Sequence, residues 1–170
     1  IAENNEIKFV ILRNTSLNMA MGGSSGNQIS FKPIPLYYAD GSENHANVAS
    51  QVALTHKRIN IGDAYTTDGF DFSGTKLFDA NTKYRSKSFL TIPLLNNEGN
   101  VIGVLQLINS KDIKTGEIIP FADDDVLEAL VLLATAALDG YIREASLRQE
   151  IAQLKIEIDQ TRRARQVAEI

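Results

Sequence analysis

Apolar positions are densest in residues 84–109, YRSKSFLTIPLLNNEGNVIGVLQLIN. The pattern predicts two β-strands, at residues 88–95 and 101–109, joined by a polar Asn-Asn-Glu-Gly turn that is typical of hairpins. Both faces of the second strand are mostly apolar, so we expect this hairpin to lie at the centre of the fold with other elements on both sides. Gln106 is the one polar side chain within that apolar run, and its amide requires a hydrogen-bonding partner.

Weaker patterns precede the hairpin. They predict a strand at 7–12, a long loop at 14–43 with a short strand at 29–32, a short helix at 46–56 and a strand at 59–61. Residues 63–82 mix aromatic residues with Asp, Gly and Thr, which predicts irregular structure with one turn of helix near 75–80. We expect the hairpin partner of the first strand to lie upstream of Ile1.

After residue 120 the apolar residues recur at the spacing of an α-helix. Cap and first-turn carboxylates at 121–125 predict a long helix that begins near Asp123. Its first part carries a wide apolar stripe, which suits packing against the sheet or against a symmetry mate. The members of this stripe are Leu127, Leu130, Ala134, Ala137, Leu138 and Tyr141.

Beyond Tyr141 the helical pattern narrows to a heptad seam. Apolar residues recur there at alternating spacings of four and three, with charged residues at most other positions. The pattern predicts a parallel homodimer in which two such helices form a coiled coil. The seam residues are Leu147, Ile151, Leu154 and Ile158.

Composition and charge restrict the function. The chain has 170 residues, of which 44% are hydrophobic, enough to bury one core. Its net charge is −4, with basic residues scattered except at 162–165, which argues against binding of nucleic acid. The absence of cysteine excludes disulfides and cysteine nucleophiles. No apolar run approaches the roughly 20 residues that span a bilayer, so we expect a cytoplasmic chain with no membrane partner.

Neither a metal site nor an active site is expected. The aspartates between residues 63 and 79 lack the alternate spacing and the final Glu of a calcium loop, and two histidines alone do not form a metal site. The sequence also lacks a nucleophile elbow and a paired general acid and base. We therefore expect that this chain is not an enzyme, although an attached output domain could be one.

Several strings, in this order, resemble a GAF domain: NIGDAY at 60–65, TKYRSKSFL at 82–90, IPL at 92–94, GVLQLIN at 103–109 and FADDD at 121–125. The likeness covers roughly residues 6–142 and is to the cyclic-nucleotide-binding kind found in phosphodiesterases and bacterial cyclases. It implies an α+β fold, an α/β sandwich with a central antiparallel sheet of about six strands, helices on both faces and a long C-terminal helix. We expect the GAF domain at 1–142, without the family's N-terminal helix and first strand, and a coiled-coil signalling helix at 143–170.

The resemblance also implies a ligand pocket on the sheet face away from the terminal helices. Two of the matching positions lie in a strand that stacks on and hydrogen-bonds a purine, and two at the start of a short helix whose backbone approaches a phosphate. Three polar positions surround the base and ribose, and one lies at the pocket floor. In the same order, these residues are Leu12, Arg13, Val48, Ala49, Asp79, Thr82, Ser86 and Gln106.

The Asn-Lys-Phe-Asp-Glu signature of the family is kept in part. Asn109, Phe121 and Asp125 match it, the Lys is displaced by one position to Lys111, and the Glu is absent. In the family the Lys and Asp pair to brace the fold near the pocket. Here Lys111 and Asp125 either pair from a shifted register, or Asp125 is simply a first-turn helix residue.

Two functions remain open. In the first, a cytoplasmic sensory domain binds a small ligand, with cAMP and cGMP as candidates and no other cofactor, and signals through a dimeric helix to an output domain in the same polypeptide. In the second, the domain binds no ligand and serves as a dimerisation module of a signalling protein.

Overall fold

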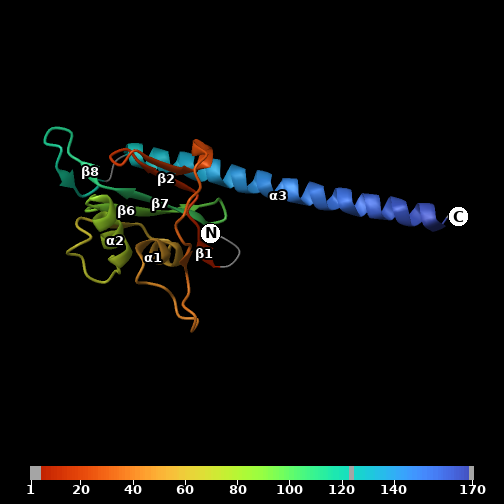
Figure 1. Ribbon diagram of the computed structural model, residues 1–170, viewed down its shortest axis with the longest axis horizontal. Helices are drawn as coiled ribbons and strands as arrows, with labels where there is room; N and C mark the ends of the chain where they lie inside the picture. The colour runs from red at the N-terminus through yellow and green to blue at the C-terminus, as the bar shows by residue number, and fades with distance from the viewer. Residues whose placement is uncertain (1–4, 123–124, 169–170) are drawn as a thin grey trace.

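A three-stranded antiparallel sheet is the largest sheet in the computed structural model, which describes residues 5–122 and 125–168 (Figure 1). Its strands are, in spatial order, β5 (Ile59–Ile61), β6 (Phe89–Leu95) and β7 (Val101–Ile108). β6 and β7 form the hairpin that the sequence predicts, with Leu90 opposite Leu107. The hairpin is confirmed, and the α+β class of the fold with it.

The sheet is smaller than the six strands that we expected. The other strands form separate ladders: β1 (Glu6–Ile7) with β4 (Ile34–Pro35), β2 (Ile11–Asn14) with β3 (Met19–Gly22), and β8 (Ser110–Lys111) with β9 (Ile118–Ile119). β2 pairs with β3 because a tight turn joins them, in which Asn14 Oδ1 accepts a hydrogen bond from the Leu17 N–H. Among the described strands β7 is therefore an edge of its sheet, and the predicted central place of the hairpin is wrong for this strand.

The two faces of β6 carry different cores. On one face Leu90 and Ile92 pack with Leu127 of the long helix α3 (Asp125–Ala168). On the other, Phe89 packs with residues around α1 (Val48–Thr55). Figure 1 shows the resulting layers, with α3 above the sheet and α1 below it. Alternate residues of β6 therefore point to opposite faces of the sheet. One face is covered by α3, and the other carries the candidate site.

The long segment between β2 and α1 is more ordered than the sequence predicts. It contains β3, β4 and the 3-10 helix η1 (Gly23–Ser25), whereas residues 29–32 form no strand. Phe31 explains this difference, because its ring packs against the rings of Phe9 and Phe78, with centroids 5.5 and 6.2 Å away. Aromatic packing holds the segment without a strand partner.

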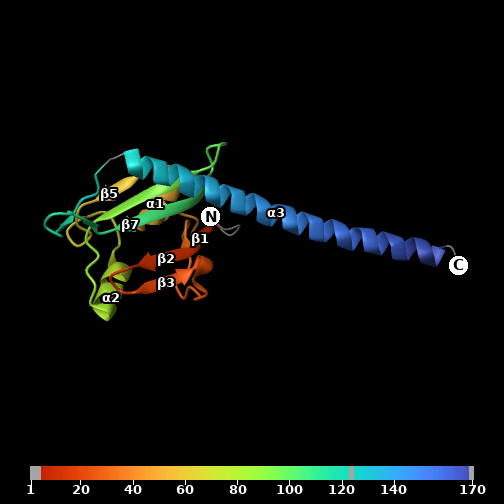
Figure 2. The ribbon, with the colours of Figure 1, turned by 90° about the horizontal axis from the view of Figure 1, so that it is seen from above.

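Helix α2 (Ser73–Thr82) is longer than the single turn that we expected. Figure 2 shows that α2, β2 and β3 lie beyond the β7 edge of the three-stranded sheet. Phe78 of α2 contacts Phe31, so this helix packs on the segment that precedes α1 as well as on the residues around β6.

Helix α3 starts on the sheet and continues far beyond it (Figures 1 and 2). A Cβ atom at Gly103 would lie 2.7 Å from Leu138 Cδ2, so a glycine in β7 lets the helix lie close to the sheet. All side chains at 141–164 are exposed. The predicted continuity of the helix past Tyr141 is confirmed, while its predicted start at Asp123 lies outside the described residues. In the described part of the chain, no helix has the length and apolar character that a membrane crossing requires.

Candidate functional site

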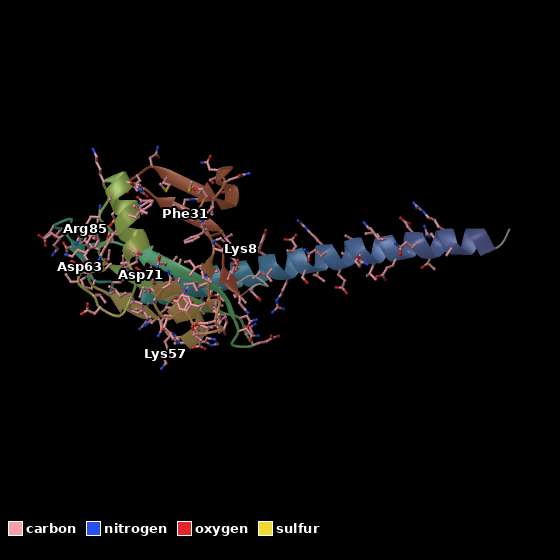
Figure 3. The ribbon with its side chains drawn as sticks, turned by 60° about the horizontal axis from the view of Figure 1, so that its bottom comes forward. Lys8, Phe31, Lys57, Asp63, Asp71 and Arg85 are labelled. Atoms are coloured by element: carbon pink, nitrogen blue, oxygen red, sulfur yellow. The ribbon has the colours of Figure 1, made fainter. Side chains whose placement is uncertain are left out.

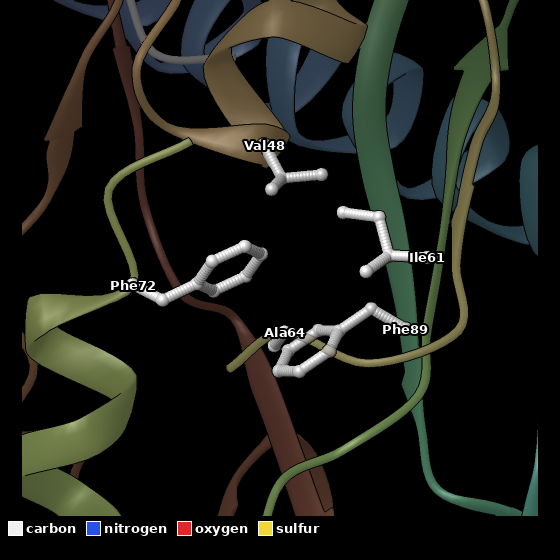
Figure 4. Close-up of a cluster of buried hydrophobic side chains, with 5 residues drawn as sticks. All are labelled: Val48, Ile61, Ala64, Phe72 and Phe89. Atoms are coloured by element: carbon white, nitrogen blue, oxygen red, sulfur yellow. The ribbon is translucent and has the colours of Figure 1, made fainter. Parts of the chain in front are cut away.

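A compact apolar cluster fills the space between the start of α1 and the sheet (Figure 4). Its buried members are Val48, Ile61, Ala64, Phe72 and Phe89. The rings of Phe72 and Phe89 have centroids 5.5 Å apart, and Val48 is only 5% exposed. The side chain of Val48 therefore belongs to the core, which leaves its backbone as the part that the resemblance predicts to approach a phosphate.

The first turn of α1 is capped by Asn47. Its Oδ1 atom accepts hydrogen bonds from the N–H groups of Ala49, at 2.9 Å, and of Ser50, at 3.2 Å. The predicted phosphate contact at Ala49 thus uses an N–H group that already has a partner, and an anion would have to displace the Asn47 side chain. A ligand contact at Val48 and Ala49 stays a prediction.

The centre of the candidate site is the carboxylate of Asp79 in α2. Asp79 is 3% exposed and accepts three hydrogen bonds. The donors are the Ser86 N–H and hydroxyl, each at 2.7 Å, and the Tyr65 hydroxyl at 2.9 Å. Two of the predicted site residues, Asp79 and Ser86, are thus in direct contact. Together with Tyr65 they connect α2, the segment before β6 and the segment after β5.

Tyr65 is also held by two cations. The Arg85 guanidinium lies 3.3 Å from the centroid of its ring, and Lys76 Nζ lies 5.3 Å from it. Arg85 Nη2 also lies 3.7 Å from Asp63 Oδ1. Figure 3 labels both residues, which lie close together at the same end of the domain. Burial, and then the hydrogen bond to Asp79 and its negative charge, raise the pKa of the Tyr65 phenol above its usual range. The phenol is therefore kept protonated as a donor to Asp79.

Asn109 anchors the segment that joins α2 to β6. Its Oδ1 accepts the Lys87 N–H at 2.7 Å, and its Nδ2 donates to the Arg85 carbonyl at 2.7 Å and to the Tyr84 hydroxyl at 3.0 Å. Its φ of 62° is left-handed, a conformation that Asn tolerates better than most residues. The signature asparagine therefore has a structural role beside the Asp79 cluster.

The other signature residues lie apart from this cluster. Phe121 packs on the core under α3, and its carbonyl accepts a hydrogen bond from Asn60 Nδ2 at 2.7 Å. Lys111 is exposed in β8 and Asp125 is exposed in the first turn of α3. The described residues include no ion pair between Lys111 and Asp125, so the structure favours the first-turn helix role for Asp125.

The remaining predicted contacts are spread over the molecule. Gln106 Nε2 donates to Thr91 Oγ1 at 3.0 Å, and Gln106 is exposed because β7 is an edge strand. The Thr82 hydroxyl donates to the Phe78 carbonyl of its own helix. Arg13 binds carbonyl groups of the β2–β3 hairpin, and the neighbouring Leu12 is half-buried. The contact of these side chains with a ligand remains a prediction.

Neither of two shallow hollows, one beside the start of α1 and the other beside β1 and β4, is lined by the eight predicted residues. One has a volume of about 250 Å³ and includes Asn44, Asn47 and Asp71 in its lining. The other has a volume of about 480 Å³ and includes Glu6 and Tyr37. Hydrogen bonds from the Ser73 side chain and backbone hold the pKa of Asp71 below its usual range. This carboxylate therefore places a negative charge at the first hollow.

Sequence reasoning missed Tyr65, Arg85 and Asn47 as structural parts of the site. Asn47 directly precedes the first apolar residue of the short helix, which is the ordinary signal of an N-cap. Tyr65 and Arg85 are 20 positions apart in the sequence, and no local pattern indicates that their side chains meet.

Comparison with known proteins shows the family to which the chain belongs. The GAF domain family matches residues 21–138. The chain is 29% identical over 124 residues to dual 3',5'-cyclic-AMP and -GMP phosphodiesterase 11A of Takifugu rubripes, covering 72% of this chain and 13% of that protein. It is 37% identical over 79 residues to the cGMP-specific 3',5'-cyclic phosphodiesterase of Drosophila virilis, covering 46% of this chain and 8% of that protein.

A solved structure was also found, that of free methionine-R-sulfoxide reductase from Neisseria meningitidis in complex with its substrate. It is 18% identical in sequence, with a TM-score of 0.36, and the similar part covers 75% of this chain and 60% of that one. The chain spans only about a tenth of the length of the phosphodiesterases above. Because the family match extends over most of the chain, from β3 to the part of α3 that lies on the sheet, the chain belongs to the GAF domain family.

Proposed function

We propose that this chain is a regulatory module in which residues 1–142 form a GAF domain that binds a small ligand and residues 143–170 form a coiled coil in a homodimer. One observation carries the proposal: α3 is a single helix that contributes Leu127 to the core on β6 and then exposes the heptad residues from Leu147 onward. A change in the sheet can therefore reach the dimer seam through one continuous element. A regulatory role of this kind requires no catalytic step from these residues.

The ligand face is the side of β6 and β7 that carries Thr91 and Gln106, opposite α3. Gln106 presents an exposed amide there, whose Nε2 donates a hydrogen bond to Thr91 Oγ1. The relatives are named for their action on cAMP and cGMP. These two nucleotides are therefore the first candidate ligands.

Isothermal titration calorimetry with cAMP, cGMP, AMP and GMP tests ligand binding directly. We expect saturable heat with one cyclic nucleotide, and loss of that heat when Gln106→Leu removes the amide. Asn97→Ala, in the exposed turn between β6 and β7, is the matched control and should leave binding unchanged. Absence of heat with every nucleotide would contradict the cyclic-nucleotide proposal.

A second function, a dimerisation module without ligand, is favoured by a specific observation. Phe72 and Phe89 fill the space beside Val48, and Asp79 and Ser86 satisfy each other by hydrogen bonds. A site already packed and paired needs no ligand for its stability. Sedimentation of a stable dimer, together with the absence of heat in calorimetry and the same dimer with and without nucleotide, would support this second function.

A further inference from the structure

Residues 34–38 form a wall between the two shallow hollows, and Pro35 lines both of them. Hydrogen bonds hold this wall at both edges. The Leu36 N–H donates to the Asn5 carbonyl and the Asn44 N–H donates to the Leu36 carbonyl, each at 2.8 Å. Asn44 Nδ2 also donates to the Pro35 carbonyl at 2.8 Å. The wall is therefore a fixed part of the domain surface.

Each hollow contains a tyrosine and a carboxylate. Tyr38 and Asp71 line the hollow beside α1, which we call the Asp71 hollow. Tyr37 and Glu6 line the other, which we call the Glu6 hollow. Tyr38 is 45% exposed and Tyr37 is 40% exposed, so the domain itself leaves both of these large side chains partly uncovered. Two neighbouring hollows thus repeat one combination of side chains.

Hydrogen bonds fix the ring and the carboxylate of the Asp71 hollow. The Tyr38 hydroxyl donates at 2.8 Å to Oδ1 of Asn44, which is itself buried. Asp71 Oδ1 accepts the Ser73 N–H at 2.8 Å, and the Asp71 N–H donates to the Ala46 carbonyl at 2.8 Å. A ligand therefore meets groups that are already in place and does not have to order them.

The segments around the hollows are acidic. No Lys or Arg occurs at residues 33–56 or 59–75. The acidic residues of these two ranges are Asp40, Glu43, Asp63, Asp68 and Asp71. Within the part of the chain that the structure describes, neither Asp71 nor Glu6 forms an ion pair, and Lys76 acts on the pKa of Asp71 only through the field of its charge. Both hollows are therefore suited to a positively charged group.

We infer that the two hollows form one docking surface for a basic segment of a partner protein, in which one arginine side chain occupies the Asp71 hollow and another the Glu6 hollow. A guanidinium group both pairs with a carboxylate and stacks on an aromatic ring, which is the combination that each hollow offers.

The shape of the hollows favours a peptide over a small molecule. The Asp71 hollow has a volume of about 250 Å³, which is below the roughly 300 Å³ at which small-molecule sites begin. Both hollows are shallow, so neither encloses a ligand. Firm binding then requires two anchors at once, and an extended peptide with two arginines supplies them in one molecule.

This surface is separate from the proposed ligand face and from α3. Figure 1 shows the segment between β4 and α1, in orange, projecting from the domain on the side away from α3. The inference therefore goes beyond the proposed function, and it does not depend on a bound nucleotide or on a dimer.

Fluorescence anisotropy with labelled synthetic peptides tests the surface on the full chain. The probes carry two arginines separated by one, two or three alanines, and a matched set carries citrulline, which keeps the shape of arginine without its charge. We expect saturable binding of at least one arginine peptide, at least tenfold tighter than its citrulline counterpart and weaker at high salt. Absence of saturable binding at millimolar peptide, or equal binding of the two sets, would overturn the inference.

Charge-removing variants locate the anchors. Asp71→Asn and Glu6→Gln keep the shape of each side chain, and each should weaken binding about fivefold. Asp68→Asn is the matched control, because Asp68 is also exposed but lines neither hollow, and it should change binding less than twofold. Equal losses in all three variants would show unspecific attraction to a chain of net charge −4 and would overturn the inference. A loss in only one of the two hollows would overturn the two-anchor arrangement.

The ring and the kind of occupant are tested separately. Tyr38→Ala should weaken binding about threefold, while Tyr38→Phe keeps the ring and should bind like the natural chain. Equal binding by these two variants would overturn the role of the ring in the anchor. Free arginine and spermidine are the competitors that represent small cations. If either displaces the labelled peptide as effectively as the unlabelled peptide does, the occupant is a small cation and the peptide inference is overturned.

Discussion

The carboxylate of Asp79 shows how one side chain joins three segments of the candidate site. It lies in α2 and accepts hydrogen bonds from Tyr65, after β5, and from Ser86, before β6. Each donor satisfies part of the hydrogen-bonding capacity of a buried charge, which would otherwise be costly to remove from water. The position of α2 relative to the sheet therefore depends on this carboxylate.

Replacing Asp79 should destabilise the domain in a graded way. Asp79→Ala leaves the Ser86 N–H and hydroxyl and the Tyr65 hydroxyl without an acceptor, and we expect a loss of about 3 kcal/mol in the free energy of unfolding. Asp79→Asn keeps one oxygen and should lose about half as much. Urea unfolding followed by circular dichroism measures both, with Asp68→Ala, at an exposed position, as the control. A loss in Asp79→Ala no larger than in that control would contradict the role of the carboxylate.

The phenol of Tyr65 should ionise at a higher pH in the folded protein than in the unfolded chain. Burial raises its pKa first, followed by the hydrogen bond to Asp79 and the charge of that residue. A raised folded pKa favours the neutral phenol, so the stabilisation is complete below the unfolded pKa of about 10 and is lost as the pH rises through the folded pKa.

An ultraviolet absorbance titration of the tyrosines checks this prediction. The titration of Tyr65→Phe, subtracted from that of the natural chain, gives the step that belongs to Tyr65, and Asp79→Asn should move that step to lower pH because it removes the negative charge beside the phenol. Tyr141→Phe, which changes a side chain that is 67% exposed, is the control and should leave the Tyr65 step in place. A Tyr65 step at or below the pH at which tyrosine ionises in the unfolded chain would contradict this prediction.

Among the elements, α3 connects the two parts of the proposed mechanism. Its sheet face holds Leu127 in the core, and its distal half exposes apolar residues that no other described element covers. Exposed leucine and isoleucine at heptad spacing are stabilised only by another helix. The charges that flank the seam then decide whether a parallel or an antiparallel arrangement of the two helices is favoured.

Charge exchange on α3 should change which chains pair. Glu150→Lys combined with Glu157→Lys should weaken self-association, as should Lys155→Glu combined with Arg162→Glu. With about 0.5 kcal/mol for each of four interhelical pairs, the loss is about 2 kcal/mol, or roughly 30-fold in the dissociation constant. A mixture of the two variants should form dimers again.

Analytical ultracentrifugation at low and high salt measures this exchange. The differences should shrink at high salt, because exposed charges are screened there. Equal self-association of the natural chain and both variants at low salt would show that these charges do not face each other across the interface.

At the scale of the whole molecule, the domain and the distal helix form one elongated unit (Figure 1). The domain has its own two core clusters, one on each face of the sheet, whereas residues 141–164 bury no side chain within the chain. The folding of the domain and the pairing of the helices should therefore be separable.

Ile151→Asp combined with Leu154→Asp should abolish the pairing of the helices while the domain stays folded. Charges at adjacent seam positions cannot be buried between helices, so we expect monomers in sedimentation at concentrations where the natural chain is a dimer. The near-ultraviolet circular dichroism of the domain should remain, since neither residue contacts its core. A dimer that survives this double change would place the main interface on the domain portion of α3.

Much of the fold follows from patterns that are local in the sequence. The β6–β7 hairpin, helix α1 and the continuous α3 are confirmed because period, turn residues and caps act over a few neighbouring positions. The absence of cysteine and the heptad seam are likewise properties of the sequence alone. The GAF family is also identified from ordered strings of residues.

Only the tertiary structure decided which distant residues meet. That β2 pairs with β3, leaving β7 at an edge and Gln106 exposed, depends on competition between ladders that strand patterns alone do not resolve. The contacts of Asp79 with Tyr65 and Ser86 arise when the chain is folded, because side chains on separate segments carry no shared period. The division of the apolar residues of α3 between the sheet and an exposed stripe depends on how the helix is rotated on the sheet, which packing at Gly103 and Leu138 sets.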